Sequence, residues 1–192
     1  HRAETHSLFW LTLASAPIAA IVAGASREFD RFGRWWLAIW LVLITHPLLD
    51  AMTVYGTQLS LPFSDWAWGV GSIFIIDPLY TLPLLVGLTV SLARRRAPNR
   101  LRANLAGLAL STLYLGWSVL GQTLAEDRVR NALAASGEAG AREVPMLVTP
   151  TAFNTLLWRG VVMRGDHYEE GFVSLLDRDR PLRLARFERL IG

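Results

Sequence analysis

The sequence predicts an all-α polytopic membrane bundle of about four transmembrane helices, followed by a small C-terminal α+β appendage. The composition is the first reason, because 52% of the 192 residues are hydrophobic and only 18% are charged. A mean hydropathy of +0.31 is high for a soluble domain of this length. The second reason is that all basic residues are arginines, grouped in short stretches between apolar runs, which is typical of membrane topology rather than of nucleic-acid binding.

Four apolar stretches approach the ~20 residues that a helix needs to cross a bilayer. They are residues 8–25, 35–54, 70–93 and 103–125. Three arginines follow the first stretch and five follow the third, at positions 27, 31 and 34 and at positions 94, 95, 96, 100 and 102. Arginine-rich connections stay on the cytoplasmic side, so we expect residues 1–7, residues 55–69 and the chain after residue 125 on the outer side.

The chain is therefore expected to divide into a transmembrane domain, residues 1–125, and a small extramembrane domain, residues 126–192. In the second domain, a helix over residues 127–141 precedes three apolar runs, residues 144–150, 155–163 and 167–176, which predict a short antiparallel sheet. Apolar residues and arginines are mixed in the tail, residues 181–191, which predicts an amphipathic surface helix.

His46 and Asp50 are the most unusual residues of the second apolar stretch. Ionisable groups inside a membrane helix cost about 2.5–3.5 kcal/mol each, so they usually have a partner or a function. A spacing of four residues places both on one helix face, and imidazole and carboxylate are both zinc ligands. Because the chain has no cysteine, thiolate ligands are excluded. A structural hydrogen bond between the two side chains is the alternative.

The N-terminal segment HRAETHS adds two more histidines, His1 and His6, at the same expected membrane depth. We therefore expect His1, His6, His46 and Asp50 to bind a divalent metal, most simply zinc. Arg2 would hold an anionic group, because its planar guanidinium suits phosphate or carboxylate, although a snorkelling arginine is the alternative. Since the chain begins without methionine, we also expect residues upstream of His1 in the gene product.

Asp77 precedes Pro78 within the third apolar stretch. An uncompensated charge there would be costly, so we expect Asp77 to point into the bundle, where it could orient a ligand histidine. Alternatively, Asp77 caps a helix that has Pro78 at its first position, and the third span then begins near Pro78.

Four segments together resemble a bacterial family of inner-membrane proteins described as metal-dependent hydrolases, some of them LexA-associated. The segments are HRAETHS, HPLLD with TVYGTQLSLPF, FIIDPLYTLPLL and TPTAFNTLLWR. In that family the first motif reads HRxxTHS, and a Pro-Asp-x-Asp element precedes it, so the resemblance implies further carboxylate ligands upstream. The HxxxD helix is also distantly similar to one in zinc-dependent phospholipase C enzymes.

The family resemblance implies a metal-dependent hydrolase of the bacterial inner membrane. The similarity to phospholipase C, together with a site at the outer interface, suggests a phosphate-bearing or ester lipid as its substrate. Arg2, Asp77 and Arg159 are then candidate catalytic residues. The same motifs suggest five substrate-binding residues, Ser7, Tyr55, Thr57, Gln58 and Asn154, although Ser7 could instead cap the first helix. Membrane lipid is the expected partner, and no nucleic acid is expected. The alternative is a non-enzymatic lipid- or partner-binding membrane protein with a structural His/Asp cluster.

Overall fold

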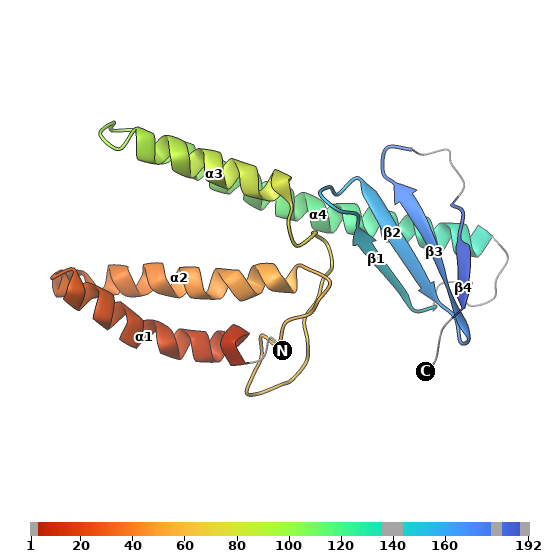
Figure 1. The fold of residues 1–192 in the computed structure, drawn as a ribbon, viewed down its shortest axis with the longest axis horizontal. Coiled ribbons are helices and arrows are strands. Elements are labelled where there is room, and N and C mark those ends of the chain that lie inside the picture. The colour runs from red at the N-terminus through yellow and green to blue at the C-terminus, as the bar shows by residue number, and fades with distance from the viewer. Residues whose placement is uncertain (1–3, 136–143, 178–181, 189–192) are drawn as a thin grey trace. The chain divides into compact units, whose positions relative to one another are not determined.

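The computed structural model describes residues 4–135, 144–177 and 182–188 (Figure 1). The chain forms two compact units, His1–Gly71 and Ser72–Gly192. In the described residues, three helical stretches are long and apolar enough to cross a membrane: Leu8–Ala25, Phe29–Ala51 and Leu101–Ala135. The expected helical membrane architecture with a small C-terminal sheet is therefore confirmed, while the third apolar helix, Pro78–Ala93, is shorter than predicted.

The first unit is a helical hairpin that begins with a short 3-10 turn, Glu4–His6. Helix α1 (Leu8–Ala25) follows, then a second 3-10 turn (Phe29–Arg31) and helix α2 (Phe32–Ala51). Ser7 caps α1, because its hydroxyl accepts a hydrogen bond from the Trp10 backbone N–H at 3.3 Å. The capping role considered for Ser7 is thus confirmed.

Two indole groups of α2 join the helices of this hairpin. Trp36 Nε1 donates to Ser15 Oγ at 2.9 Å, and Trp40 Nε1 donates to Thr12 Oγ1 at 3.0 Å. The α1 side of the contact includes the buried alanines Ala19 and Ala23, whose small side chains allow close approach. Polar groups on apolar helices are therefore satisfied within the hairpin.

In the second unit, helix α3 (Pro78–Ala93) packs antiparallel to helix α4 (Leu101–Ala135) (Figure 1). The third apolar helix begins at Pro78 rather than at residue 70, because Asp77 Oδ1 accepts from the Leu79 N–H at 2.9 Å and caps it. The capping interpretation of Asp77 is confirmed. With 16 residues, α3 is shorter than the expected span.

Glycines bring α3 and α4 into backbone contact. A Cβ atom built on Gly107 would lie 2.3 Å from the Pro83 carbonyl oxygen, and one on Gly87 would lie 2.7 Å from the Ala103 carbonyl oxygen. Ser111 Oγ adds a hydrogen bond to the Tyr80 carbonyl at 2.7 Å. The two helices are therefore held by close packing of small residues, as expected in a membrane.

A four-stranded antiparallel sheet packs against the C-terminal half of α4. Its order is β1-β2-β3-β4, with β1 (Met146–Pro150), β2 (Leu157–Met163), β3 (His167–Ser174) and β4 (Ala185–Glu188). The core between helix and sheet consists of Ala125, Val129, Leu133, Val148, Trp158, Val162 and Val173. Helix α4 is continuous past residue 125, so one helix contributes both to the apolar hairpin and to the core of the sheet.

The predicted helix over residues 181–191 is wrong for the described part of that tail. Residues 185–188 form β4, which pairs with β3 so that Phe187 lies opposite Tyr168. The two rings stack at a centroid distance of 5.3 Å. Backbone pairing with β3 and this stacking favour a strand over the helix that the mixed composition suggested. The three other expected strands are confirmed.

We expect Gly107→Ala to lower the thermal stability of the purified protein in detergent. The added methyl group meets the rigid Pro83 carbonyl, and overpacking of this kind costs about 1–3 kcal/mol.

Gly116→Ala is the matched control on the same helix, because a Cβ atom there meets nothing within 4 Å. Its unfolding midpoint should stay the same or rise, since alanine favours a helix over glycine by roughly 0.5–1 kcal/mol. Equal midpoints for the two variants would contradict the close approach of α3 and α4.

Candidate metal centre

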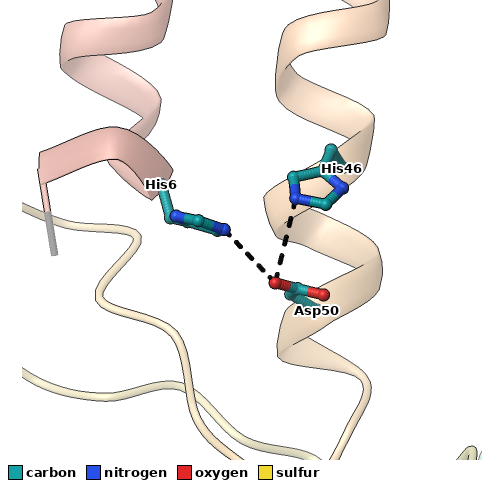
Figure 2. Close-up of side chains that lie close together, drawn as sticks. All are labelled: His6, His46 and Asp50. Atoms are coloured by element: carbon teal, nitrogen blue, oxygen red, sulfur yellow. Dashed lines mark ion pairs between the residues drawn. The ribbon is translucent and has the colours of Figure 1, made fainter. Parts of the chain in front are cut away.

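His6, His46 and Asp50 come together at one end of the α1–α2 hairpin (Figure 2). His6 belongs to the turn before α1, whereas His46 and Asp50 lie one helical turn apart near the end of α2. The His6 Nε2 atom is 3.3 Å from Asp50 Oδ2, and the His46 Nε2 atom is 4.0 Å from the same oxygen. One potential ligand atom from each residue lies within 4.8 Å of the others.

These separations suit a small divalent cation. Ligand atoms at about 2.0–2.2 Å from a tetrahedral zinc ion are roughly 3.3–3.6 Å from one another. The distance between His6 Nε2 and Asp50 Oδ2, 3.3 Å, already lies in that range. The distance from His46 Nε2, 4.0 Å, requires only a small movement of a side chain that is 68% exposed. Two imidazoles and a carboxylate are also the donor set of many zinc sites.

The burial of the group is uneven. The side chains of His6 and Asp50 are only 17% and 16% exposed, so the imidazole and the carboxylate that face each other are both largely shielded from solvent. The imidazole rings of His6 and His46 have centroids 5.3 Å apart and are tilted by 47°. The more exposed imidazole, His46, leaves the group open on one side.

Thr5 contacts the imidazole of His6 on the side away from Asp50. The Thr5 Oγ1 atom lies 2.9 Å from His6 Nδ1, the ring nitrogen that faces away from Asp50. Metal-binding histidines commonly make such a hydrogen bond with the nitrogen that does not bind the metal. Sequence reasoning assigned no such role to Thr5, although its place directly before His6 in HRAETHS is the available signal.

The loop after α2 is tied to the turn that carries His6. The Ser7 hydroxyl donates to the Leu61 carbonyl, at 2.5 Å, and the Leu8 N–H donates to the Leu59 carbonyl at 3.1 Å. The other end of this loop returns to α2, because the Val70 N–H donates to the Ala51 carbonyl at 2.8 Å. The loop therefore connects the ends of both helices beside the His/Asp group.

Four of the predicted substrate-binding residues lie in this unit, in different environments. Ser7 and Thr57 are fully buried, and in the described part of the chain the Thr57 hydroxyl has no hydrogen-bond partner. Gln58 Nε2 donates to the Asp65 carbonyl at 2.9 Å, so it braces the loop. Tyr55 is 64% exposed. Their roles in substrate binding stay predictions.

Asp77, Asn154 and Arg159 belong to the second unit. Asp77 is 2% exposed, and its second carboxylate oxygen accepts from the Tyr114 hydroxyl at 2.8 Å. Asn154 Oδ1 accepts from the backbone N–H groups of Leu156 and Leu157 at 3.0 and 2.8 Å, which shapes the β1–β2 turn.

Arg159 forms a bidentate ion pair with Glu170 on the sheet. Its Nε donates to Glu170 Oε1 at 2.8 Å and its Nη2 donates to Oε2 at 2.7 Å. The guanidinium group lowers the pKa of the Glu170 carboxyl, mainly through these hydrogen bonds. The charge of Arg159 is thus compensated, and the proposed roles of Asp77, Asn154 and Arg159 at a catalytic site stay predictions.

His1 and Arg2, expected as a metal ligand and as an anion-binding residue, lie outside the described residues. Within the described ranges, only His6, His46 and Asp50 form a cluster of histidine and acidic groups suited to a metal ion.

One family model matches the chain, that of the YdjM inner membrane protein family, over residues 1–125. The match includes α1, α2 and α3, the His/Asp group and most of α4. Neither a curated protein nor a solved structure matches the chain. The inner-membrane part of the expected resemblance is thereby confirmed.

We expect Glu170→Gln to destabilise the protein at pH 7 because it removes one half of the Arg159–Glu170 pair. Since the pKa of Glu170 is lowered from 4.5 in the folded protein, the pair stabilises the fold above that pH. This contribution is lost as the pH falls through the lowered folded-state pKa. Unfolding midpoints measured from pH 7 to pH 3 should therefore converge for wild type and variant, and a constant gap would contradict the assignment.

Proposed function

The chain belongs to the YdjM inner membrane protein family, and we propose that it is a membrane-embedded, metal-dependent hydrolase with its metal centre at His6, His46 and Asp50. The observation that carries the proposal is the convergence of these three side chains. Ligand atoms from two segments about 40 residues apart in sequence lie within 4.8 Å of one another, and ionisable groups on apolar helices usually have a function.

The three residues have complementary roles in this proposal. His6 and His46 would bind the cation through neutral imidazoles, and Asp50, placed next to both, would neutralise part of its charge. A bound divalent ion, most simply zinc, would supply a Lewis acid for an ester or phosphoryl oxygen and a more acidic water. The exposed side of His46 would leave room for a substrate, as an open catalytic centre requires.

The position of the group at the end of two apolar helices suggests a lipid substrate. With α1 and α2 across the membrane, His6 and Asp50 would lie at the level of the lipid head groups. The loop tied to them carries exposed tryptophan side chains, Trp66 at 66% and Trp68 at 51% exposure. Aromatic side chains of this kind favour the membrane interface. A phosphate-bearing or ester lipid could then reach the centre from within the bilayer, and binding of its anionic group is the role predicted for Arg2 from the sequence.

The arginines suggest which side of the membrane this end faces. Arg27 and Arg31 lie between α1 and α2, and Arg34 lies in the first turn of α2, so all three are at the opposite end of the hairpin from His6 and Asp50. By the positive-inside rule the turn is cytoplasmic, so we propose that the centre faces the periplasm in a multi-pass inner-membrane protein.

A non-enzymatic membrane protein is the alternative, and one observation favours it. The 3.3 Å contact between His6 Nε2 and Asp50 Oδ2 is also compatible with a hydrogen bond that ties the start of α1 to the end of α2. In that case the cluster stabilises the hairpin, and lipid or partner binding occurs elsewhere.

Metal content distinguishes the two functions. We expect protein purified in detergent to retain about one divalent ion per chain by elemental analysis, and His46→Ala and Asp50→Ala to lose most of it. The same variants should lose hydrolysis of phosphate-bearing lipids. His167→Ala is the matched control, because His167 lies on β3 and pairs with Asp166 instead.

Wild-type protein that takes up no metal, together with a His46→Ala variant that is only less stable, would refute the hydrolase and support the structural alternative. Metal bound equally by His46→Ala and wild type would refute the assigned ligands.

Thr5 offers a second test, because its hydroxyl can accept a hydrogen bond from His6 Nδ1–H and leave the Nε2 lone pair for the metal. We expect Thr5→Val to weaken metal affinity by about 10–100-fold. Thr5→Ser should restore it, since serine keeps the hydroxyl. Equal affinities for the valine and serine variants, from competition with a chelating dye, would contradict this role.

A further inference from the structure

The turn between β1 and β2, residues 151–156, lies at the end of the sheet nearest the start of α3 (Figure 1). In this turn Phe153 is 56% exposed and Leu156 is 38% exposed. We propose that the β1–β2 turn is immersed in the lipid bilayer, where Phe153 and Leu156 contact lipid acyl chains. The proposal rests on the membrane location of the chain and is independent of the metal centre and of the hydrolase function.

Hydrogen bonds hold the turn at the level of Asp77, the residue that caps α3. Trp117 Nε1 donates to Thr155 Oγ1 at 3.1 Å, and the Thr155 hydroxyl donates to the Tyr114 hydroxyl at 3.2 Å. Tyr114 in turn donates to Asp77 Oδ2 at 2.8 Å. Thr155 and Asp77 are only 1% and 2% exposed, so these bonds are buried. The turn is therefore fixed beside the end of the α3–α4 hairpin that lies away from Arg94.

Helix α3 is too short to cross the hydrocarbon by itself. Its 16 residues give a length of about 24 Å at 1.5 Å per residue, whereas the hydrocarbon core of a bilayer is ~30 Å thick. At the other end of α3, Arg94 follows directly and leaves no apolar residue to extend the helix. Either apolar groups continue beyond Asp77, or the bilayer must become thinner around the hairpin.

Apolar groups do continue beyond Asp77. Ile75 and Ile76, directly before it, are 46% and 65% exposed. The neighbouring ring of Phe74 packs edge-to-face against Phe153, with a centroid distance of 5.5 Å. The segment before α3 and the β1–β2 turn thus form one apolar surface that extends the hairpin, as a bilayer thicker than α3 requires.

Charge distinguishes the two ends of the sheet. Residues 145–158 contain no charged side chain, and Asp77, which is buried, is the only charged residue between positions 72 and 93. At the opposite end, Arg164, Asp166 and Glu169 lie in or beside the β2–β3 turn. Charged groups are costly inside a bilayer, so the end with the β1–β2 turn is the one that lipid can surround.

The backbone of the turn is suited to a medium without water. Asn154 Oδ1 accepts from the N–H groups of Leu156 and Leu157 at 3.0 and 2.8 Å, and Asn154 Nδ2 donates to the Ala152 carbonyl at 3.1 Å. The Leu156 carbonyl accepts from the Leu175 N–H at 2.8 Å. Irregular backbone is tolerated at membrane depth only where the protein itself satisfies such groups.

Phe153 has a backbone conformation that argues for a function of its ring. Its φ angle is 66°, in the left-handed region, where glycine and asparagine are common and bulky residues are rare. Such a conformation is unfavourable, and residues kept in it tend to occur at functional sites. Contact of the ring with lipid is a function that glycine or asparagine could not supply.

The test uses single-cysteine variants of the full chain, which has no cysteine of its own. Phe153→Cys and Leu156→Cys carry a nitroxide label in lipid nanodiscs of phosphatidylglycerol and phosphatidylcholine. Leu85→Cys, at an exposed position in the middle of α3, is the reference within the bilayer. Gly165→Cys is the control at the opposite end of the sheet, because a Cβ atom there meets nothing within 4 Å.

The readout is collision of each label with oxygen, which concentrates in hydrocarbon, and with a water-soluble nickel chelate. We expect the labels at 153 and 156 to collide more with oxygen than with nickel, as at Leu85, and the label at Gly165 to show the reverse. Phe153→Asn in the Leu156→Cys background should shift the label towards nickel, because asparagine tolerates the left-handed backbone but loses the apolar ring.

Four results would overturn the proposal. Labels at 153 and 156 that collide mainly with nickel would place the turn in water. Labels shielded from both reagents would show that protein, such as a second copy of the chain, covers the turn. Equal behaviour of the labels at 153 and Gly165 would exclude selective immersion of one end. An unchanged label at 156 in Phe153→Asn would exclude Phe153 as the group that holds the turn in lipid.

Discussion

The structure depends on one constraint, that polar groups on apolar helices must find partners within the protein. A bilayer offers them no water, so an unpaired group there is costly. Each hairpin meets the constraint in its own way. In the first, indole N–H groups of α2 bond to hydroxyls of α1, as Trp36 does with Ser15. In the second, the Tyr114 hydroxyl bonds to Asp77, which also caps α3.

The same constraint explains why the His/Asp group occurs at a helix end. Asp50 lies in the last turn of α2, where its partly buried carboxylate meets His6 from the turn before α1. The Ser7 hydroxyl donates a hydrogen bond to the Leu61 carbonyl, so the loop after α2 is tied to the turn that carries His6. Such a frame would keep the ligand atoms close with or without a cation, which is why both a metal centre and a structural cluster are compatible with the geometry.

The second unit shows how one helix can serve two environments. The N-terminal part of α4 packs on α3 through glycines, and its C-terminal part contributes Val129 and Leu133 to the core of the sheet. The composition of α4 changes along its length: residues 103–125 carry no charge, whereas charged residues occur from Glu126 onwards, next to the core residues Val129 and Leu133.

Local sequence patterns determined most of the fold. Residues 8–25 match α1, and the three short apolar runs after residue 144 predicted three of the four strands, because the lengths and boundaries of such runs are encoded locally. The HxxxD spacing placed His46 and Asp50 on one helix face for the same reason. The tail was misassigned as a helix, since its pairing with β3 joins residues far enough apart that no local period records it.

Contacts between distant segments were decided only by the tertiary structure. The sequence by itself identified His6, His46 and Asp50 as ligand candidates, but packing of α1 on α2 brought His6 to 3.3 Å from Asp50. Packing of β2 on β3 also paired Arg159 with Glu170. A side chain's chemistry and its place along a helix can be read from the sequence, whereas its partners across helices and strands depend on how the whole chain folds.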